Sequence, residues 1–375
     1  MSDSDETMFL EAETSFGLSM LQQLPLNESV VFSPLSIALA LSLVHAGSEG
    51  DTKSQIASAI CKGANDDQLK QHYSFLSNSF SNPANGVEVN VANKAFVSKE
   101  FPIKDSYLKS IKDSYKAAAE SLDFSNGGKS AGVMNDFVRT NTKGKITEIV
   151  KADDVTPDTA MFLINALYLK ADWAEEFYKS DTKDMDFHIK NEVINKIPFM
   201  SDNEIHRDYA SNSEVEVLSL KYKDNAYRFN IFLPKEKFGL EKFVKGLTAA
   251  KIQELLKGLK DTYLNIKIPK MKLESEQCLK KLLTKLGITD MFQDTKANLK
   301  EMSDKALYVS KATHKAIIEV DEMGTVAAAT TALKIVPKML RPKPKVTFVA
   351  DHPFLFALTY QNHPIFIGAY MGDKK

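Results

Sequence analysis

The chain has 375 residues, of which 43% are hydrophobic and 26% are charged, so it can bury a large core and is not an intrinsically disordered chain. Its 48 basic and 49 acidic residues leave a formal net charge of -1, and only four of the basic residues are arginine. This balance argues against a nucleic-acid-binding protein, which usually carries an excess of basic residues and grips phosphates with arginine.

The two cysteines, Cys61 and Cys278, are too few for a framework of disulfides. The N-terminal residues lack the basic and apolar regions of a secretory signal. The longest apolar stretches, 37–44 and 160–169, are far shorter than the roughly 20 residues that cross a bilayer. We therefore expect a cytoplasmic protein without membrane partners, although a non-classical route of secretion stays open.

Two helices are predicted near the N-terminus. The first covers residues 6–24, where apolar residues recur at helical spacing. The second begins at Pro34, because Ser33 can cap its free N–H groups and proline suits the first helical position, and it stops at Gly47. Residues 37–44 are apolar on nearly every side, so we expect this second helix to lie at the centre of the molecule.

Strands are predicted at residues 87–91, which alternate between apolar and polar, and at residues 161–169, an apolar run. The second strand contains Asn165, whose buried amide will need hydrogen-bond partners. Further elements are expected later in the chain: helices at residues 129–141, 240–259 and 277–286, and strands at residues 227–233, 264–268, 346–350, 354–360 and 365–370. Helices dominate first and strands later, which predicts an α+β fold. No linker or repeat divides the chain, which predicts a single domain over residues 1–375.

The chain contains none of the motifs His-Glu-x-x-His, Cys-x-x-Cys or Gly-x-Ser-x-Gly. Residues 127–130, Gly-Gly-Lys-Ser, resemble part of a phosphate-binding loop, but such a loop needs glycine where this chain has Asp123, whose charge would repel a phosphate. We interpret them as a turn and the start of a helix. His352 and His363, each followed by proline, are interpreted as ordinary residues of turns. The sequence therefore predicts a protein that is not an enzyme, with no cofactor and no metal site.

Residues 322–345 carry a different pattern. Every second residue from Thr325 onwards has an uncharged and mostly small side chain: Thr325, Ala327, Ala329, Thr331, Leu333 and Ile335. No proline lies between Thr325 and Pro337, so each residue there can donate its N–H to a ladder, which favours a strand able to enter a sheet. Residues 341–345 are rich in proline and are expected to be extended and exposed. From the pattern alone, a short alanine-rich helix or a linker without function stays open.

Residues 322–331 resemble the hinge of the reactive loop in the serpin family, and five further motifs occur in the order typical of that family. They are VFSPLSI at 31–37, NDF at 135–137 with GKI at 144–146, LINALYLK at 163–170 with Trp173, PKM at 269–271 with LGI at 286–288, and DHPFLF at 351–356. The resemblance covers nearly the whole chain. It implies a monomeric α+β serpin fold with a large mixed central sheet, additional sheets, about eight to nine helices and an exposed reactive-centre loop within residues 322–345.

The resemblance implies that the chain inhibits a protease as a suicide substrate. The protease attacks the exposed loop and forms an acyl-enzyme, and the freed loop then inserts into the main sheet as a new central strand, which distorts the protease before it can deacylate. The native state is then metastable and held by a kinetic barrier. The implied partner is a trypsin-like or chymotrypsin-like serine endopeptidase, or a cathepsin-like cysteine protease, and neither nucleic acid nor membrane is expected as a partner.

The resemblance also assigns roles to three groups of residues. The hinge, which starts the insertion and which we expect to be solvent-exposed before cleavage, comprises Glu322, Gly324, Thr325, Val326, Ala327, Ala328, Ala329 and Thr330. The shutter, a polar cluster where the sheet must open, comprises Ser33, Ser36, Asn165 and His314. The breach, at the end of the sheet where the loop enters, comprises Trp173 and an ion pair of Lys270 with Glu322. Without the resemblance, we would interpret the same residues as a helix cap, a buried amide, an ordinary histidine, a core tryptophan and two solvated charges.

The scissile bond is located by counting along the loop. Counting from Glu322 with the usual hinge length places it between Lys338 and Met339, and the lysine would fit the pocket of a trypsin-like protease. Counting back from Phe348 favours Leu340 instead. Cleavage at Met339 or Leu340 would direct the inhibitor to chymotrypsin-like or cathepsin-like enzymes.

Two further functions stay open. One is a non-inhibitory serpin that acts as a binding or chaperone-like protein, although the small, uncharged hinge favours inhibition, because non-inhibitory members often depart from it. The other is an interaction module that binds a polyanion through the basic residues Lys338, Arg341, Lys343 and Lys345. Arg341 is a poor cleavage site because Pro342 follows it.

Overall fold

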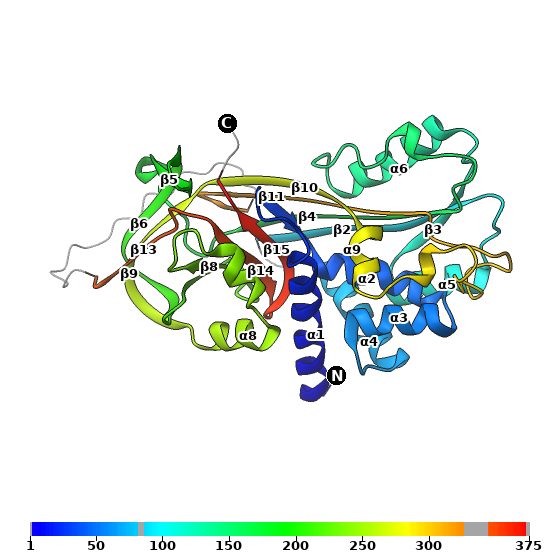
Figure 1. The fold of residues 1–375 in the computed structure, drawn as a ribbon, viewed down its shortest axis with the longest axis horizontal. Coiled ribbons are helices and arrows are strands. Elements are labelled where there is room, and N and C mark those ends of the chain that lie inside the picture. The colour runs from blue at the N-terminus through cyan, green and yellow to red at the C-terminus, as the bar shows by residue number, and fades with distance from the viewer. Residues whose placement is uncertain (1, 82–85, 326–343, 373–375) are drawn as a thin grey trace.

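The computed structural model describes residues 2–81, 86–325 and 344–372 (Figure 1). Within them lie nine α-helices: α1 (Asp3–Leu21), α2 (Pro34–Ala46), α3 (Gly50–Cys61), α4 (Asp66–Ser81), α5 (Asp105–Tyr115), α6 (Gly127–Asn141), α7 (Leu240–Lys245), α8 (Ala249–Lys257) and α9 (Leu279–Lys285). The predicted number of helices is confirmed for this part of the chain.

The main sheet has six strands, in the spatial order β10 (Met271–Cys278), β11 (Lys311–Asp321), β12 (Gly324–Thr325), β4 (Met161–Asp172), β2 (Val87–Ser98) and β3 (Ala118–Leu122). Strands β11 and β4 are parallel and pair directly, from Lys311 opposite Phe162 to Ile317 opposite Tyr168. Beyond these residues the two-residue strand β12 lies between them and pairs with both. We refer to the directly paired part of β4 and β11 as the seam.

The second sheet has nine strands. Eight of them follow one another in the order β1 (Val30–Phe32), β15 (His363–Tyr370), β14 (Phe354–Tyr360), β8 (Tyr227–Pro234), β7 (Val215–Lys221), β6 (Val193–Ser211), β9 (Lys260–Pro269) and β13 (Val346–Val349), while β5 (Lys183–Lys190) pairs with β6. The large mixed sheet, the second sheet and the separate helices confirm the predicted α+β class. The single-domain organisation stays a prediction.

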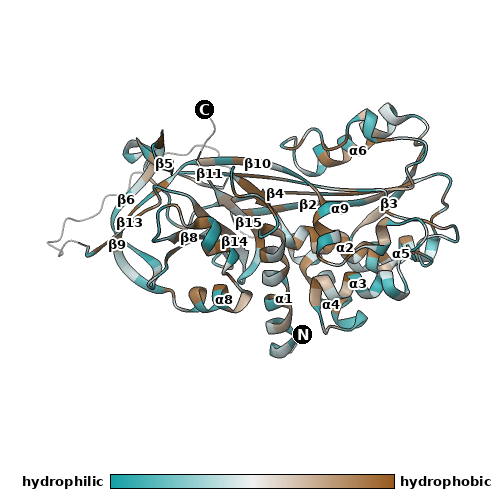
Figure 2. Ribbon diagram, in the orientation of Figure 1, coloured by the Kyte–Doolittle hydropathy of each residue, from teal (hydrophilic) through white to brown (hydrophobic). Residues whose placement is uncertain are grey.

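Helices cover both faces of the main sheet. Figure 1 shows α6 on one side and α2–α5 on the other. The contact with α6 forms a small apolar core, which includes Phe96 and Phe162 from the sheet and Met134 and Val138 from the helix. Hydrophilic and hydrophobic residues alternate along α6 (Figure 2), because only the side that faces the sheet is buried.

Helix α2 lies at the centre, as predicted. Its N-terminus is capped by Ser33, whose side chain accepts a hydrogen bond from the backbone N–H of Ser36 at 3.1 Å, and Pro34 begins the first turn. Every residue from Pro34 to His45 is buried, which explains why residues 37–44 are apolar on nearly every side.

Two predicted helices differ from the observed ones. The helix expected over residues 240–259 is divided into α7 and α8, because Gly246 ends the first and Thr248 caps the second. Gln277 and Cys278, expected in a helix, still belong to β10, and α9 starts at Leu279. Residues 127–130 form the start of α6 and follow a turn at residues 124–126, which agrees with the interpretation of this segment as a turn and a helix start.

Candidate functional site

Strand β12 is the part of the predicted hinge that follows the turn at residues 322–323. Thr325 pairs with Ala171 of β4 on one side and with Val320 of β11 on the other. Its side chain is fully buried, and its hydroxyl shares a hydrogen bond of 2.7 Å with the hydroxyl of Tyr222. The expectation that the hinge is solvent-exposed before cleavage is therefore wrong at Glu322, which is 3% exposed, and at Gly324 and Thr325. The turn folds Gly324 and Thr325 back between two strands, where their backbone groups gain ladder partners that the sequence pattern alone does not reveal.

Gly324 allows β12 to approach β4. Its φ of +146° lies in a region that residues with a side chain rarely adopt. A Cβ atom at this position would lie only 2.0 Å from the carbonyl oxygen of Ala171. Any other residue here would therefore push β12 out of the sheet or displace β4.

Glu322 fixes the turn that leads into β12. Its carboxylate accepts hydrogen bonds of 2.8 Å from Nζ of Lys270 and from the hydroxyl of Thr182, and its side chain is only 4% exposed. Its backbone oxygen accepts a hydrogen bond from the N–H of Phe177 at 2.8 Å. Burial raises the pKa of Glu322, but the hydrogen bonds of Lys270 and Thr182 outweigh this effect and hold the pKa below its usual value. The pair is thus more than two solvated charges.

Trp173 holds the same turn from inside the molecule. Its indole N–H donates to the backbone oxygen of Asp321 at 2.9 Å, and its backbone N–H donates to the oxygen of Met323 at 2.9 Å. The buried indole stacks on the ring of Tyr222, with centroids 4.5 Å apart and planes 9° from parallel. Tyr222 was not among the residues predicted for this site, yet it contacts both Trp173 and Thr325.

The seam contains a cluster of buried polar side chains. Asn165 of β4 lies opposite His314 of β11, and its side-chain oxygen accepts a hydrogen bond from Nδ1 of His314. The amide group of Asn165 donates to the backbone oxygen of Ser36 at 2.9 Å, to its hydroxyl at 2.6 Å, and to the side-chain oxygen of Asn93 in β2. The backbone N–H of Ser33 donates to Nε2 of His314 at 2.9 Å. The four residues predicted as the shutter thus lie together, and Asn93 joins them.

These contacts fix the protonation of His314. Nε2 accepts a hydrogen bond, so the ring proton lies on Nδ1, which donates to Asn165. Because the ring is completely buried, its pKa is lowered to about 3. His314 is therefore neutral at physiological pH.

Two histidines interpreted as ordinary turn residues are buried instead. His352 is 8% exposed, and its Nε2 contacts the backbone oxygen of Pro234 at 2.8 Å. His363 is 4% exposed, begins strand β15 and contacts the carboxylate of Glu13 in α1. His352 lies in the bend before β14, as interpreted, although its side chain is buried. The interpretation is wrong at His363, which pairs with Tyr360 as the first residue of β15 and is removed from solvent by its contact with α1.

The remaining predicted site residues lie outside the residues that the structure describes. They comprise the rest of the hinge, Val326, Ala327, Ala328, Ala329 and Thr330, and the candidates for the scissile bond, Lys338, Met339 and Leu340. Their roles stay predictions.

Comparisons with known proteins agree on one family. Residues 11–372 match the family model described as "Serpin (serine protease inhibitor)". Iripin-2 from Ixodes ricinus is 33% identical over 94% of this chain and 90% of its own length, and leukocyte elastase inhibitor from Equus caballus is 32% identical over 93% and 94%. The crystal structure of Serpin48 from Tenebrio molitor superimposes with a TM-score of 0.89 at 27% identity and covers 100% of both chains. In the described part of the chain, no helix has both the length and the apolar character needed to span a membrane.

The buried His314 makes the stability of the fold depend on pH. Its pKa is about 3 in the native state and near 6.5 in an unfolded chain, so the unfolded state binds more protons between these values. The stability that depends on neutral His314 is complete above pH 6.5 and falls as the pH drops through this window. We expect the melting temperature, measured at a fixed heating rate, to be lower at about pH 5.5 than at about pH 7.5, and His314→Gln to reduce the difference.

The matched control is His206→Gln. The side chain of His206 is half-exposed, whereas that of His314 is completely buried, so removal of His206 should leave the pH dependence close to that of the wild type. Equal pH dependence in the wild type and in His314→Gln would contradict the assignment.

A charge at residue 325 should expel β12 from the sheet. Thr325→Arg would bury an unpaired guanidinium against Tyr222, at a cost of several kcal/mol. Trp173 is the only tryptophan of the chain and stacks on Tyr222, so we expect the fluorescence emission of the uncleaved variant to shift relative to the wild type. Thr325→Ser keeps the hydroxyl and should keep the wild-type emission. Identical spectra for the two variants would show that β12 does not depend on this contact.

Proposed function

This chain belongs to the serpin family and is a protease inhibitor, and we propose that it acts as a suicide substrate. The nucleophile of the target protease attacks the scissile carbonyl in the reactive loop, forms an acyl-enzyme and releases the new amino terminus. The loop then inserts between β4 and β11 and carries the protease with it. The observation that supports this proposal best is β12, because the first residues of the hinge already lie between these two strands.

The pairing of β12 supports a direction for the proposed insertion. It also supports a phase, by which we mean the set of side chains that point inward in the inserted strand. It runs antiparallel to both β4 and β11, so a strand that continued it would replace the single ladder of the seam with two ladders. Side chains alternate along a strand, and Thr325 points into the interior. Ala327 and Ala329 would then also point inward, which agrees with the small, uncharged series in the sequence.

Estimates of the free energies support a native state that a kinetic barrier keeps from inserting its loop. Insertion would add ladder hydrogen bonds and bury Leu333 and Ile335, each worth roughly 1.5–3 kcal/mol when fully buried. It first requires the seam to open, which breaks the buried hydrogen bond between Asn165 and His314. The native state is then stable because of this barrier rather than because it has the lowest free energy.

The proposed target is a serine endopeptidase or a cathepsin-like cysteine protease. Cleavage after Lys338 would make it trypsin-like, and cleavage at Met339 or Leu340 would make it chymotrypsin-like or cathepsin-like. The name of the leukocyte elastase inhibitor supports an endopeptidase target without deciding between these classes. We also propose a cytoplasmic location, with which the free thiols of Cys61 and Cys278 are compatible.

The trap predicts a covalent complex. Incubation with a panel of trypsin-like, chymotrypsin-like and cathepsin-like proteases should give a 1:1 complex with at least one of them that survives denaturing electrophoresis. Mass spectrometry of the released C-terminal fragment should show Met339 at its N-terminus if Lys338 is recognised, and Arg341 if Leu340 is recognised. Cleavage of the loop without any complex across the panel would favour a non-inhibitory serpin.

The phase of insertion can be tested with a matched pair of variants. Ala327→Arg would have to bury its charge on the inward face, so insertion should be slower than deacylation and the variant should become a substrate. Ala328→Arg carries the same charge on the outward face and should still trap the protease. The measurement is the number of inhibitor molecules consumed per protease inactivated. If both variants behave alike, the proposed phase is wrong.

A further inference from the structure

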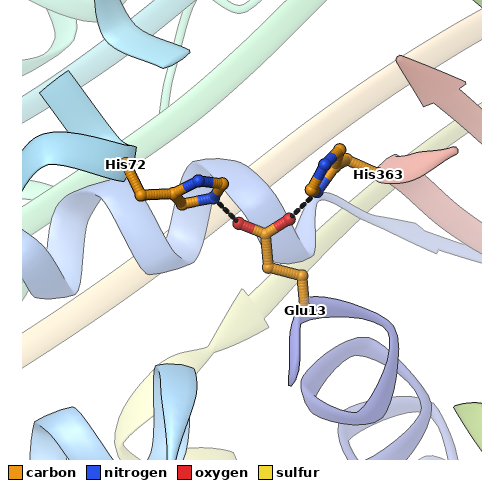
Figure 3. Close-up of side chains that lie close together, drawn as sticks. All are labelled: Glu13, His72 and His363. Atoms are coloured by element: carbon orange, nitrogen blue, oxygen red, sulfur yellow. Dashed lines mark hydrogen bonds and ion pairs between the residues drawn. The ribbon is translucent and has the colours of Figure 1, made fainter. Parts of the chain in front are cut away.

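Three side chains from distant parts of the sequence meet in the interior of the molecule. Figure 3 shows the imidazoles of His72 in α4 and His363 in β15 pointing from two sides at the carboxylate of Glu13 in α1. Nε2 of His72 lies 2.7 Å from Oε1 of Glu13, and Nδ1 of His363 lies 2.5 Å from Oε2. His72 and Glu13 are each 1% exposed, and His363 is 4% exposed. None of them belongs to the hinge, the shutter or the breach.

The surroundings of this cluster are mainly apolar and aromatic. The ring of Phe9 stacks on the imidazole of His72 at a centroid distance of 3.9 Å, and the ring of Tyr73 contacts the same imidazole edge-on. Burial raises the pKa of the nearby Cys61 thiol to about 12, so this group stays uncharged. A carboxylate in such a setting is costly unless a cation neutralises it. Burial alone would raise the pKa of Glu13, but the two imidazoles lower it to about 2, so it is present as a carboxylate.

We propose that Glu13, His72 and His363 form a binding site for one divalent transition-metal ion of the zinc type. Two imidazole nitrogens and one carboxylate are a ligand set that zinc favours, with metal–ligand distances of about 2.0–2.2 Å. The three ligand atoms all lie within 4.8 Å of one another, so one ion can reach all of them after small shifts of the side chains. Calcium and magnesium fit poorly, because they prefer sites made mainly of oxygen atoms.

The ion would take the place of the protons that now lie between the imidazoles and the carboxylate. Nδ1 of His72 is buried and has no hydrogen-bond partner among the described residues, so it can carry the ring proton when Nε2 binds the ion. Nδ1 of His363 must also be free of its proton: a neutral ring moves this proton to Nε2, and a ring protonated on both nitrogens releases the Nδ1 proton to solvent and keeps the one on Nε2. Binding therefore competes with protons and should weaken as the pH falls.

The bound ion would tie together three elements that are otherwise joined only by packing and hydrogen bonds. Helix α4 precedes β2 of the main sheet in the chain, whereas β15 lies in the second sheet. A ligand that binds the native state and not the unfolded state stabilises the native state by mass action. The site would thus make the stability of this fold depend on the supply of the metal.

The test measures metal stoichiometry. Because the site is buried, the protein should be produced in medium with added ZnCl2 and also loaded by prolonged incubation after treatment with a chelator. All samples carry Cys278→Ser, since the exposed thiol of Cys278 could bind zinc by itself. We expect one equivalent of zinc after gel filtration, and a melting temperature at least about 3 °C higher with ZnCl2 than with MgCl2. Loading with CoCl2 should give the absorption bands of a site with nitrogen and oxygen ligands.

Two substitutions decide whether the ion lies in this cluster. His72→Gln and Glu13→Gln should each lose the equivalent of zinc and the rise in melting temperature. His206→Gln is the control, because it removes a histidine that contacts a carboxylate on the surface, and it should retain both. If a variant fails to fold, the stoichiometry and the cobalt spectrum of the Cys278→Ser protein still decide. The proposal would be overturned if the Cys278→Ser protein bound less than half an equivalent of zinc. It would also be overturned if folded His72→Gln or Glu13→Gln variants bound as much zinc as the Cys278→Ser protein, because the cluster would then be held by protons alone.

Discussion

In the proposed mechanism, the state of the main sheet depends on the buried hydrogen bond between Asn165 and His314. It crosses the seam between β4 and β11, and both of its partners also bind the start of α2 through Ser33 and Ser36. Closing the sheet is therefore coupled to the position of the central helix. The imidazole is neutral, because its Nε2 accepts the N–H of Ser33 and because a buried charge without a partner would cost several kcal/mol. In the proposed mechanism, these polar groups must find new partners when the sheet opens.

Next to the seam, the arrangement around β12 supports the proposed insertion of a strand. Gly324 lets the backbone of β12 approach β4, while Trp173 and Glu322 hold the turn that precedes it. At the end of β4 and β11 that follows the seam, the two residues of β12 thus lie between these strands. Along the seam itself, β4 and β11 pair directly. This arrangement favours insertion that begins at β12 and proceeds along the seam. Each inserted residue would then break the β4–β11 pair next to one that has already been replaced by pairs with the inserted strand.

The sequence predicted the features that depend on local pattern. The caps of α2 could be identified from Ser33, Pro34 and Gly47, and a polar residue inside an apolar strand indicated that Asn165 needs partners. The roles of residues such as Lys270 came only from the family resemblance. Asn93 could have been found, because it falls on the period-two face of Val87, Val89 and Val91 and interrupts it. Tyr222 and the cluster of Glu13, His72 and His363 have no such signal, because tertiary contacts alone bring them together. For the same reason the sequence could not show that Thr325 is buried before cleavage.

The most direct test of this account is the crystal structure of the protein after cleavage of its reactive loop. The account predicts that residues 326–335 form a strand that continues β12 between β4 and β11. Asn165 and His314 would then no longer contact each other directly, and Ala327 and Ala329 would point to the same side as Thr325. A cleaved structure in which residues 162–168 still pair with residues 311–317 would contradict the account.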